Sequence, residues 1–203
     1  MTMPRKSAPE QSRSGRPAAV TREQWLYAGL EQFAAGGEGA VRIERIARDL
    51  GVTKGSYYGY FKSRDEFLRQ MLEYSLQIGT EDFITRSRAA SEPNDQMRLL
   101  LTDILKDRAG RDFEFYLRDY GQRNALAKRI AKQADERRTG YIREILERSG
   151  LPPAEAAARA EIGYCYYLGW YERNKHTALS RRELRRQLEL FGRITSVDLT
   201  SEE

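Results

Sequence analysis

The sequence predicts an all-α protein of about nine helices. Apolar residues recur at helical spacing along most of the 203-residue chain. Sustained alternation of apolar and polar residues, which would indicate strands, is not found. Glycines and prolines separate the periodic segments, where helices end. We expect three regions: a basic disordered leader over 1–20, a helix-turn-helix domain over 21–68, and a larger helical domain over 69–203.

The leader is rich in Pro, Ser, Gly and Arg and has few large apolar residues, which is typical of disordered segments. Its net charge of +3 suits a basic arm that follows a DNA groove, and an ordinary flexible extension explains it equally well. Helix starts are predicted where Ser or Thr is followed three residues later by Glu or Gln. These pairs are Thr21 with Gln24, Ser63 with Glu66 and Ser180 with Glu183, and Ser91 with Asn94 is a weaker variant.

Residues 43–68 predict a short helix, a tight turn, a second short helix over about 54–60 and the start of a long third helix. Ile46 and Leu50 are four residues apart and form one buried face. Gly51 can end the first helix in the left-handed conformation. Thr53 can cap the second helix through its hydroxyl. This order of elements is that of a helix-turn-helix.

The same residues resemble the DNA-binding signature of the TetR (tetracycline repressor) family of bacterial transcriptional regulators. The resemblance covers about Thr21 to Tyr74. It is carried by Ile46-Ala47, by Leu50-Gly51-Val52-Thr53-Lys54-Gly55-Ser56, by Tyr58, by Tyr60-Phe61-Lys62-Ser63-Arg64 and by Phe67-Leu68. Three positions depart from the usual pattern: Tyr57 replaces an aliphatic core residue, Tyr60 replaces His, and Val41-Arg42 stands where Ser or Thr often caps the first helix. We expect Tyr57 to fill core, with its hydroxyl reaching water.

The second short helix carries the candidate DNA-binding residues. Gly55 lets the helix approach base edges, Lys54 can donate to guanine O6 and N7, and Ser56 can donate or accept. Phosphate contacts are expected from the positions that make them in the resembling family, namely Thr53, Tyr58, Tyr60, Lys62 and Arg64. The charge supports this interpretation, because residues 1–70 hold 12 basic and 8 acidic side chains while the other 133 hold 23 and 22.

Beyond Arg64 we expect one long helix to about Arg88, then helices beginning near Pro93, Phe113 and Asn124. Gly110, Gly121 and Gly150 are predicted to end the helices that precede them. The helix over about 154–175 is apolar around most of its circumference, and such a helix is buried on all sides. A last helix over about 180–194 presents apolar residues at i, i+4 and i+7.

These last two helices predict a homodimer, because one domain can cover only one side of the 154–175 helix. Their pairing with twofold copies would form a four-helix interface, which the resemblance also implies. A monomer with that helix at its centre is the alternative. The candidate interface residues are Tyr166, Trp170, Leu184, Leu188 and Phe191.

Tyrosines past residue 110 indicate a pocket for a flat or amphipathic ligand, since each offers an apolar ring and one hydroxyl. Ordinary core filling explains most of them. The candidate ligand-binding residues are Phe113, Tyr116, Tyr120, Tyr164, Tyr167 and Tyr171. We expect no catalytic residue, metal site or cofactor, because metal-ligand clusters, phosphate loops and nucleophile motifs are missing. Cys165 lies in an aromatic stretch and is expected to be buried.

The sequence therefore predicts a cytoplasmic homodimeric regulator, without a membrane span or an intrachain disulfide. It would bind a double-stranded palindromic operator and leave it when a small-molecule effector binds. One alternative is an activator, or a regulator without an effector, of the same fold. Another, of a different class, is a helical enzyme that kept a helix-turn-helix.

Overall fold

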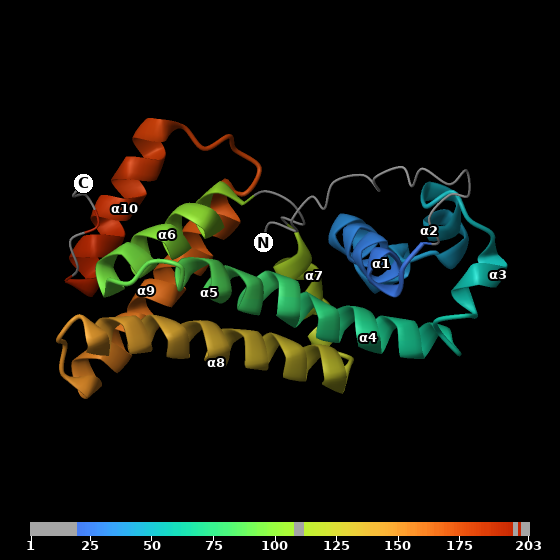
Figure 1. Ribbon diagram of the computed structural model, residues 1–203, viewed down its shortest axis with the longest axis horizontal. Helices are drawn as coiled ribbons and strands as arrows, with labels where there is room; N and C mark the ends of the chain where they lie inside the picture. The colour runs from blue at the N-terminus through green and yellow to red at the C-terminus, as the bar shows by residue number, and fades with distance from the viewer. Residues whose placement is uncertain (1–19, 108–111, 197–198, 200–203) are drawn as a thin grey trace. The chain divides into compact units, whose positions relative to one another are not determined.

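The computed structural model describes residues 20–107, 112–196 and 199. Within these ranges all regular structure is helical, with ten α-helices, one 3-10 helix and one π-helical segment (Figure 1). The all-α prediction is confirmed. The predictions for residues 1–19 of the leader and for the helix end at Gly110 lie outside these ranges.

Contacts between residues divide the chain into two compact units. In their described parts, the N-terminal unit consists of residues 20–75 and 112–131, and the C-terminal unit of residues 76–107, 132–196 and 199. The expected division after residue 68 stays a prediction. The contacts add one feature that the sequence did not indicate, which is that residues 112–131 pack with residues 20–75.

The N-terminal unit contains α1 (Arg22–Gly36), η1 (Glu38–Ala40), α2 (Ile43–Asp49), α3 (Lys54–Tyr57), most of α4 (Arg64–Leu76) and α7 (Phe113–Gly121). The predicted capping box at the start of α1 is confirmed, because Gln24 N donates to Thr21 Oγ1 and Thr21 N donates to Gln24 Oε1. Large side chains that are almost fully buried hold these helices together: Trp25, Phe33, Ile46, Phe61, Phe67, Met71 and Phe113.

Helix α3 is shorter than the expected 54–60, since only Lys54–Tyr57 is α-helical. Thr53 is its N-cap residue, but the predicted side-chain cap is wrong, because the Thr53 hydroxyl makes no capping hydrogen bond. Instead Ser56 Oγ donates to the Thr53 carbonyl at 2.8 Å. The hydroxyl of Ser63 does accept from Glu66 N at 3.1 Å, as predicted for the start of α4.

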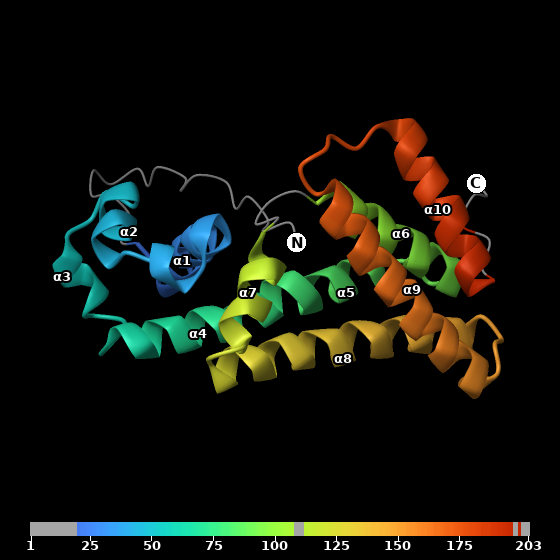
Figure 2. The same cartoon turned by 180° about the vertical axis from the view of Figure 1, so that it is seen from behind.

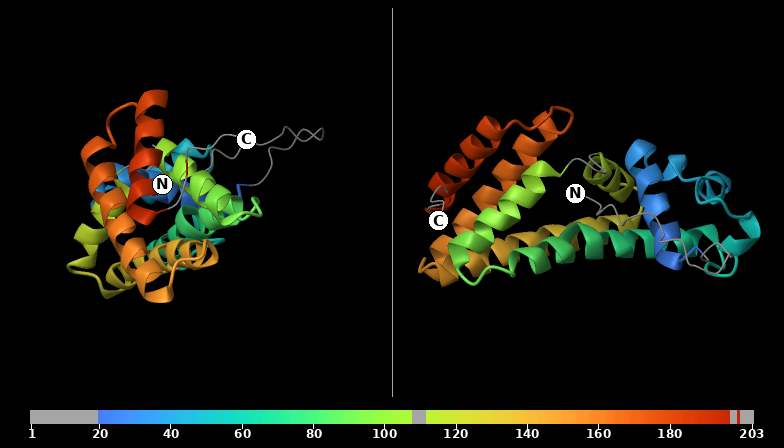
Figure 3. Two further views of the ribbon diagram at one scale, coloured as in Figure 1. Left: turned by 90° about the vertical axis from the view of Figure 1, so that its left-hand side faces the viewer. Right: turned by 45° about the horizontal axis from the view of Figure 1, so that its top comes forward.

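The C-terminal unit contains η2 (Gln77–Glu81), α5 (Asp82–Ser87), α6 (Pro93–Lys106), most of α8 (Ala125–Arg148), α9 (Pro153–Asn174) and α10 (Arg181–Thr195). Helix α10 lies alongside α9 and also packs against α6 (Figures 2 and 3). The start of α10 is capped as predicted, with Glu183 N donating to Ser180 Oγ. The weaker cap prediction at Ser91 is wrong: α6 begins after Glu92 with a proline in its first turn and no side-chain cap.

The single helix expected over 64–88 is interrupted by a π-helical segment, η2. Arg138 of α8 attaches there, donating from Nη2 to the Gly79 carbonyl at 3.2 Å and from Nε to Thr80 Oγ1 at 2.9 Å. Arg137 makes a two-bond contact with Glu81 beside it. The π-helical turn, a rare feature inside α-helices, thus coincides with side-chain contacts from a distant helix.

The sequence predicted that a single domain covers only one side of the 154–175 helix, α9, and part of this helix is exposed in the single chain. Gly163 and Tyr164 are buried, and an added Cβ at Gly163 would lie 2.9 Å from Phe191 Cζ of α10. Ile162 is 58% exposed. Cys165 is exposed as well, so its predicted burial is wrong for the single chain. None of the helices in the described ranges is both long and apolar enough to cross a membrane.

Candidate nucleic-acid interface

The turn between α2 and α3 sets the direction of α3. Gly51 has φ of +70°, as predicted for a glycine that ends a helix. Val52 N donates to the Ala47 carbonyl at 2.9 Å and Gly51 N donates to the Arg48 carbonyl at 3.1 Å. These two bonds satisfy the last carbonyls of α2 and make up a Schellman motif. The chain therefore enters α3 on a fixed path.

Tyr57 attaches α3 to the rest of the N-terminal unit. Its ring is 2% exposed and packs edge-on against Trp25 and Phe67, with centroids 5.5 and 5.7 Å away. Its hydroxyl donates to the Ser63 carbonyl at 2.9 Å, and was wrongly expected to reach water. Burial raises the pKa of the Tyr57 hydroxyl to about 12. The tyrosine in place of an aliphatic residue thus adds a polar link to the segment that precedes α4.

Around the buried Tyr57, Lys54 and Gly55 of α3 are exposed, as are the residues that follow it up to Tyr60, whereas Phe61 is buried. Tyr58 is 61% exposed. The eight predicted DNA-binding residues all lie within 53–64 of the N-terminal unit, and seven are exposed while Ser56 is half-buried: Thr53, Lys54, Gly55, Ser56, Tyr58, Tyr60, Lys62 and Arg64. We call these eight residues the α3 surface. Their contacts with DNA stay a prediction.

Two cations of the α3 surface are held by glutamates. Lys54 Nζ donates to Glu44 Oε1 at 2.5 Å, which joins the start of α3 to the first turn of α2. The hydrogen bond from Lys54 lowers the pKa of the Glu44 carboxyl, and the same bond raises the pKa of the Lys54 ammonium. Arg64 Nη2 contacts Glu38 twice, at Oε1 (2.5 Å) and at the carbonyl (3.1 Å).

Sequence reasoning missed both glutamates. Glu44 precedes Lys54 by ten residues and Glu38 precedes Arg64 by 26, so no local spacing rule connects them. Tyr60 likewise has a partner that sequence did not indicate, because its hydroxyl donates to the Val20 carbonyl. This bond holds Val20, which immediately precedes the N-cap residue of α1, beside the α3 surface.

The six predicted ligand-binding residues are divided between the two units. Phe113, Tyr116 and Tyr120 belong to the N-terminal unit, where Phe113 and Tyr120 pack against Phe33 with centroids 5.3 and 6.2 Å away. An added Cβ at Gly37 would lie 3.0 Å from the Tyr116 ring. Burial raises the pKa of Tyr120, whose hydroxyl accepts from Asn124 Nδ2. These three aromatic residues therefore fill space around the end of α1.

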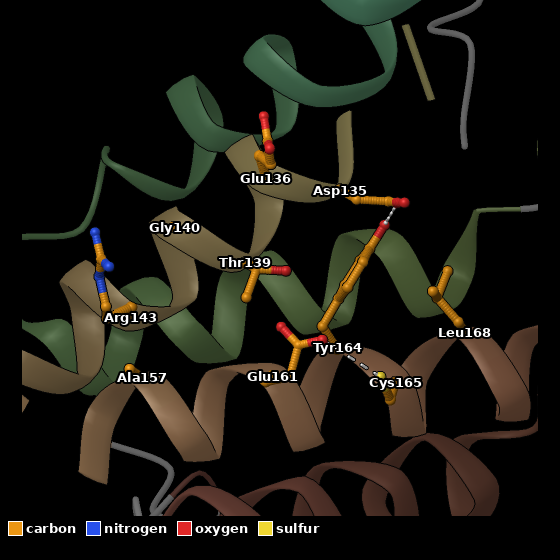
Figure 4. A pocket seen from close by; sticks show the side chains of 10 residues that line it. All are labelled: Asp135, Glu136, Thr139, Gly140, Arg143, Ala157, Glu161, Tyr164, Cys165 and Leu168. Carbon is orange, nitrogen blue, oxygen red and sulfur yellow. Dashed lines mark hydrogen bonds between the residues drawn. The ribbon is translucent and has the colours of Figure 1, made fainter. Parts of the chain in front are cut away.

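The other three, Tyr164, Tyr167 and Tyr171, follow one another along α9 in the C-terminal unit. Neighbouring ring centroids are 6.4 and 5.7 Å apart. The Tyr164 hydroxyl donates to Asp135 Oδ1 of α8 at 2.7 Å (Figure 4). A ligand role for either group of three stays a prediction.

An open groove of about 530 Å³ lies between α8 and α9 within the C-terminal unit (Figure 4). Of the six predicted ligand-binding residues, only Tyr164 lines it. Three carboxylates, a guanidinium and the exposed thiol give it a polar character: Asp135, Glu136, Glu161, Arg143 and Cys165. Among the described residues there is no group of three or more His, Cys, Asp or Glu placed to hold a metal ion.

The five predicted interface residues all lie on α9 and α10. Four are half-buried and pack against the hydrophobic core of the C-terminal unit: Tyr166, Trp170, Leu184 and Leu188. The fifth, Phe191, is 2% exposed because it is already covered within one chain. The Tyr166 hydroxyl donates to Gln187 Oε1 of α10. An interface role for these residues stays a prediction.

Comparison with known proteins assigns a family to the N-terminal helices. Residues 26–71 match the profile of the family described as bacterial regulatory proteins, tetR family. The chain is 32% identical to the transcriptional regulator AcuR of Cereibacter sphaeroides over 72 residues, which span a third of each protein. It is 28% identical to the HTH-type transcriptional regulator SrpR of Pseudomonas putida over 165 residues, 79% of this chain and 74% of that one.

Solved structures share the fold. A protein from Rhodococcus sp. described as a TetR-family transcriptional regulator aligns with a TM-score of 0.66 at 19% identity, over 87% of this chain and 97% of its own. A transcriptional regulator from Rhodococcus sp. Rha1 aligns over the same shares with a TM-score of 0.67 at 15% identity. The sequence resemblance is thereby confirmed: residues 26–71 of this chain match the tetR family of bacterial regulatory proteins, and the chain as a whole is similar to transcriptional regulators of that type.

Proposed function

We propose that the protein is a homodimeric repressor that binds a palindromic DNA operator through the α3 surface and leaves it when a small-molecule effector binds. The observation that carries the proposal is the placement of α3. The buried ring of Tyr57 holds one side of this short helix, while Lys54 and Gly55 are exposed and Ser56 is half-buried. A helix held in this way can enter a major groove.

The α3 surface divides into residues that read bases and residues that contact phosphates. Lys54 lies at the first position of α3 and Gly55 has no side chain to keep the helix from the base edges. Lys62 and Arg64 follow α3 and present ammonium and guanidinium donors, which suit phosphate oxygens. The Tyr60 hydroxyl would donate to a phosphate only by leaving the Val20 carbonyl. Phosphate contacts position the protein, and base contacts give sequence preference.

Dimerisation is supported by the outer side of α9. Ile162 and Cys165 are exposed on α9, whose other side packs against α10. A large apolar side chain such as Ile162, exposed beside a small residue such as Cys165, favours close contact with a helix of another chain. Two copies related by a twofold axis would present two α3 helices to a palindrome, as dimeric helix-turn-helix proteins do. The half-sites should then lie about 34–36 Å apart, or a multiple of that distance.

An effector is supported by the tyrosines of α9 and by the adjacent groove between α8 and α9. The row of Tyr164, Tyr167 and Tyr171 offers aromatic faces with hydroxyls, which suits a flat or amphipathic molecule. Repressor action with effector release is preferred over activation or effector independence, and a transcription assay with and without candidate effectors distinguishes these possibilities.

The proposal is tested by selecting DNA fragments with the purified protein and sequencing them. We expect a palindromic sequence to emerge. Lys54→Ala should then reduce the preference for that sequence over random DNA, by about 1–3 kcal/mol for a good base contact. Arg64→Ala should weaken binding to all sequences alike and reduce the salt dependence. Failure to enrich any sequence would overturn the proposed function.

A further inference from the structure

The contact between Lys54 and Glu44 lies at the point where the α3 surface would meet DNA. Lys54 is the first residue of α3, and Glu44 is the second residue of α2. Both side chains are exposed, and their bond of 2.5 Å joins the two helices of the helix-turn-helix. Exposed ion pairs contribute little to folding, changing an equilibrium constant by about fivefold at most. Stabilising the fold is therefore a poor explanation for a carboxylate at this position.

A carboxylate at a DNA-facing surface repels phosphates, so its presence calls for a role in binding. We propose that Glu44 is a specificity-determining residue: it holds the Lys54 ammonium beside the base edges and keeps it away from the phosphates. This inference rests on the proposed function of the α3 surface. It concerns Glu44, which no sequence pattern singled out.

The chemistry of lysine allows Glu44 to keep its contact when the operator is bound. An ammonium group has three N–H donors. One donates to Glu44 Oε1, and two remain for guanine O6 and N7, the acceptors that lysine contacts in the major groove. Glu44 thus restricts the rotamers of a long flexible side chain before DNA arrives, which lowers the entropy lost on binding.

On random DNA the same contact has the opposite effect. Without a matching guanine, a free Lys54 would gain most by reaching a phosphate, and this lysine would have to leave Glu44 to do so. The Glu44 carboxylate would also repel that phosphate. The pair therefore weakens binding to random DNA while leaving operator binding intact, and the ratio of the two affinities increases.

Helix α2 provides a matched control. Asp49 lies on the same helix, is exposed, and pairs with Arg45 at 3.8 Å instead of with a residue of α3. Glu44→Gln and Asp49→Asn each remove one negative charge from α2. A general electrostatic effect of net charge on DNA binding should be similar in both variants, whereas the release of Lys54 should occur only in Glu44→Gln.

The experiment measures the affinity of the full chain for its selected duplex and for a random duplex of equal length, at several salt concentrations. For Glu44→Gln we expect binding to random DNA to tighten about twofold to fivefold, with unchanged or weaker operator binding. The salt dependence on random DNA should steepen by about one phosphate contact, a slope change of about 0.9. Asp49→Asn should shift both affinities alike and leave their ratio unchanged.

The same pair of substitutions in a Lys54→Ala background completes the test. With no ammonium to hold, Glu44→Gln and Asp49→Asn should then have equal effects. The inference is overturned if the two substitutions change the affinity ratio equally when Lys54 is present, or if their difference persists without it. If the wild-type protein prefers no duplex over random DNA, the proposed function fails, which is a distinguishable result.

Discussion

The hydroxyl of Tyr57 donates a hydrogen bond to the main-chain carbonyl of Ser63, 2.9 Å away. This bond connects the last residue of α3 to the residue immediately before α4. The Tyr57 ring is buried against Trp25 and Phe67. One side chain therefore determines both how closely α3 packs against the core of the N-terminal unit and the path of the chain after α3.

Tyr57→Phe should lower the free energy of unfolding by about 1 kcal/mol. The ring keeps its packing, but the Ser63 carbonyl loses its donor in a partly buried position. Urea denaturation followed by circular dichroism measures the change. Tyr58→Phe is the control, because its side chain is largely exposed and the substitution should cost almost nothing. Equal effects of the two substitutions would contradict the assigned role of the Tyr57 bond.

Tyr57 should also give the fold an alkaline limit. Its pKa rises from 10.0 to about 12 in the folded protein, mainly because burial disfavours the phenolate. The folded state thus favours the protonated form, and this contribution to stability is complete below pH 10 and is lost between about pH 10 and 12, where the unfolded chain ionises first. Across that window, unfolding of Tyr57→Phe should depend less steeply on pH than unfolding of the wild type.

Gly163→Ala should destabilise the C-terminal unit by about 1–3 kcal/mol, the usual cost of overpacking. The new Cβ would lie 2.9 Å from Phe191 Cζ, so the buried Phe191 ring or the two helices would have to shift. Gly169→Ala on the same helix meets nothing within 4 Å and should stabilise it by up to about 1 kcal/mol, because alanine favours helix over glycine. Thermal unfolding of both variants tests the contact, and a stabilised Gly163→Ala would refute it.

Ile162→Glu should convert the proposed dimer into a monomer. Ile162 is 58% exposed in a single chain, so the substitution leaves the protomer fold intact but puts an unpaired carboxylate into the expected interface. Leu99→Glu on α6 is the control, since Leu99 is also exposed (38%) but lies outside the predicted interface helices. Sedimentation should show a monomer for Ile162→Glu only, and this variant alone should lose operator binding. A dimeric Ile162→Glu would place the interface elsewhere.

An effector that releases the operator should bind more weakly when operator is present. Coupling between two ligands is reciprocal, so a hundredfold loss of operator affinity implies a hundredfold loss of effector affinity, about 2.7 kcal/mol. Calorimetric titration of a candidate effector with and without the selected duplex measures the effector affinity of the operator-bound and of the free protein. Equal affinity in the two titrations would show that this ligand is not the releasing effector.

Local rules were sufficient for much of the helix-turn-helix. Gly51 adopts the left-handed conformation that its position after Leu50 predicts, and the capping box at Thr21 and Gln24 forms as expected. Such features depend on residues a few positions apart, whose geometry a single helix end determines. The fold class and the resemblance of the N-terminal helices to the tetR family could therefore be recognised from the sequence.

The sequence by itself thus determined the all-helical fold class, the turn that directs α3 and the residues that α3 presents, but not the length of α3 or the break in the 64–88 helix. Only the tertiary structure decided which side chains pair and which stay exposed. Lys54 binds Glu44, Arg138 donates to the Gly79 carbonyl in the π-helical segment, and Cys165 is exposed although its neighbours in sequence are aromatic. Each outcome depends on two helices that lie far apart along the chain, and their separation and rotation result from packing the whole core, which no local spacing encodes.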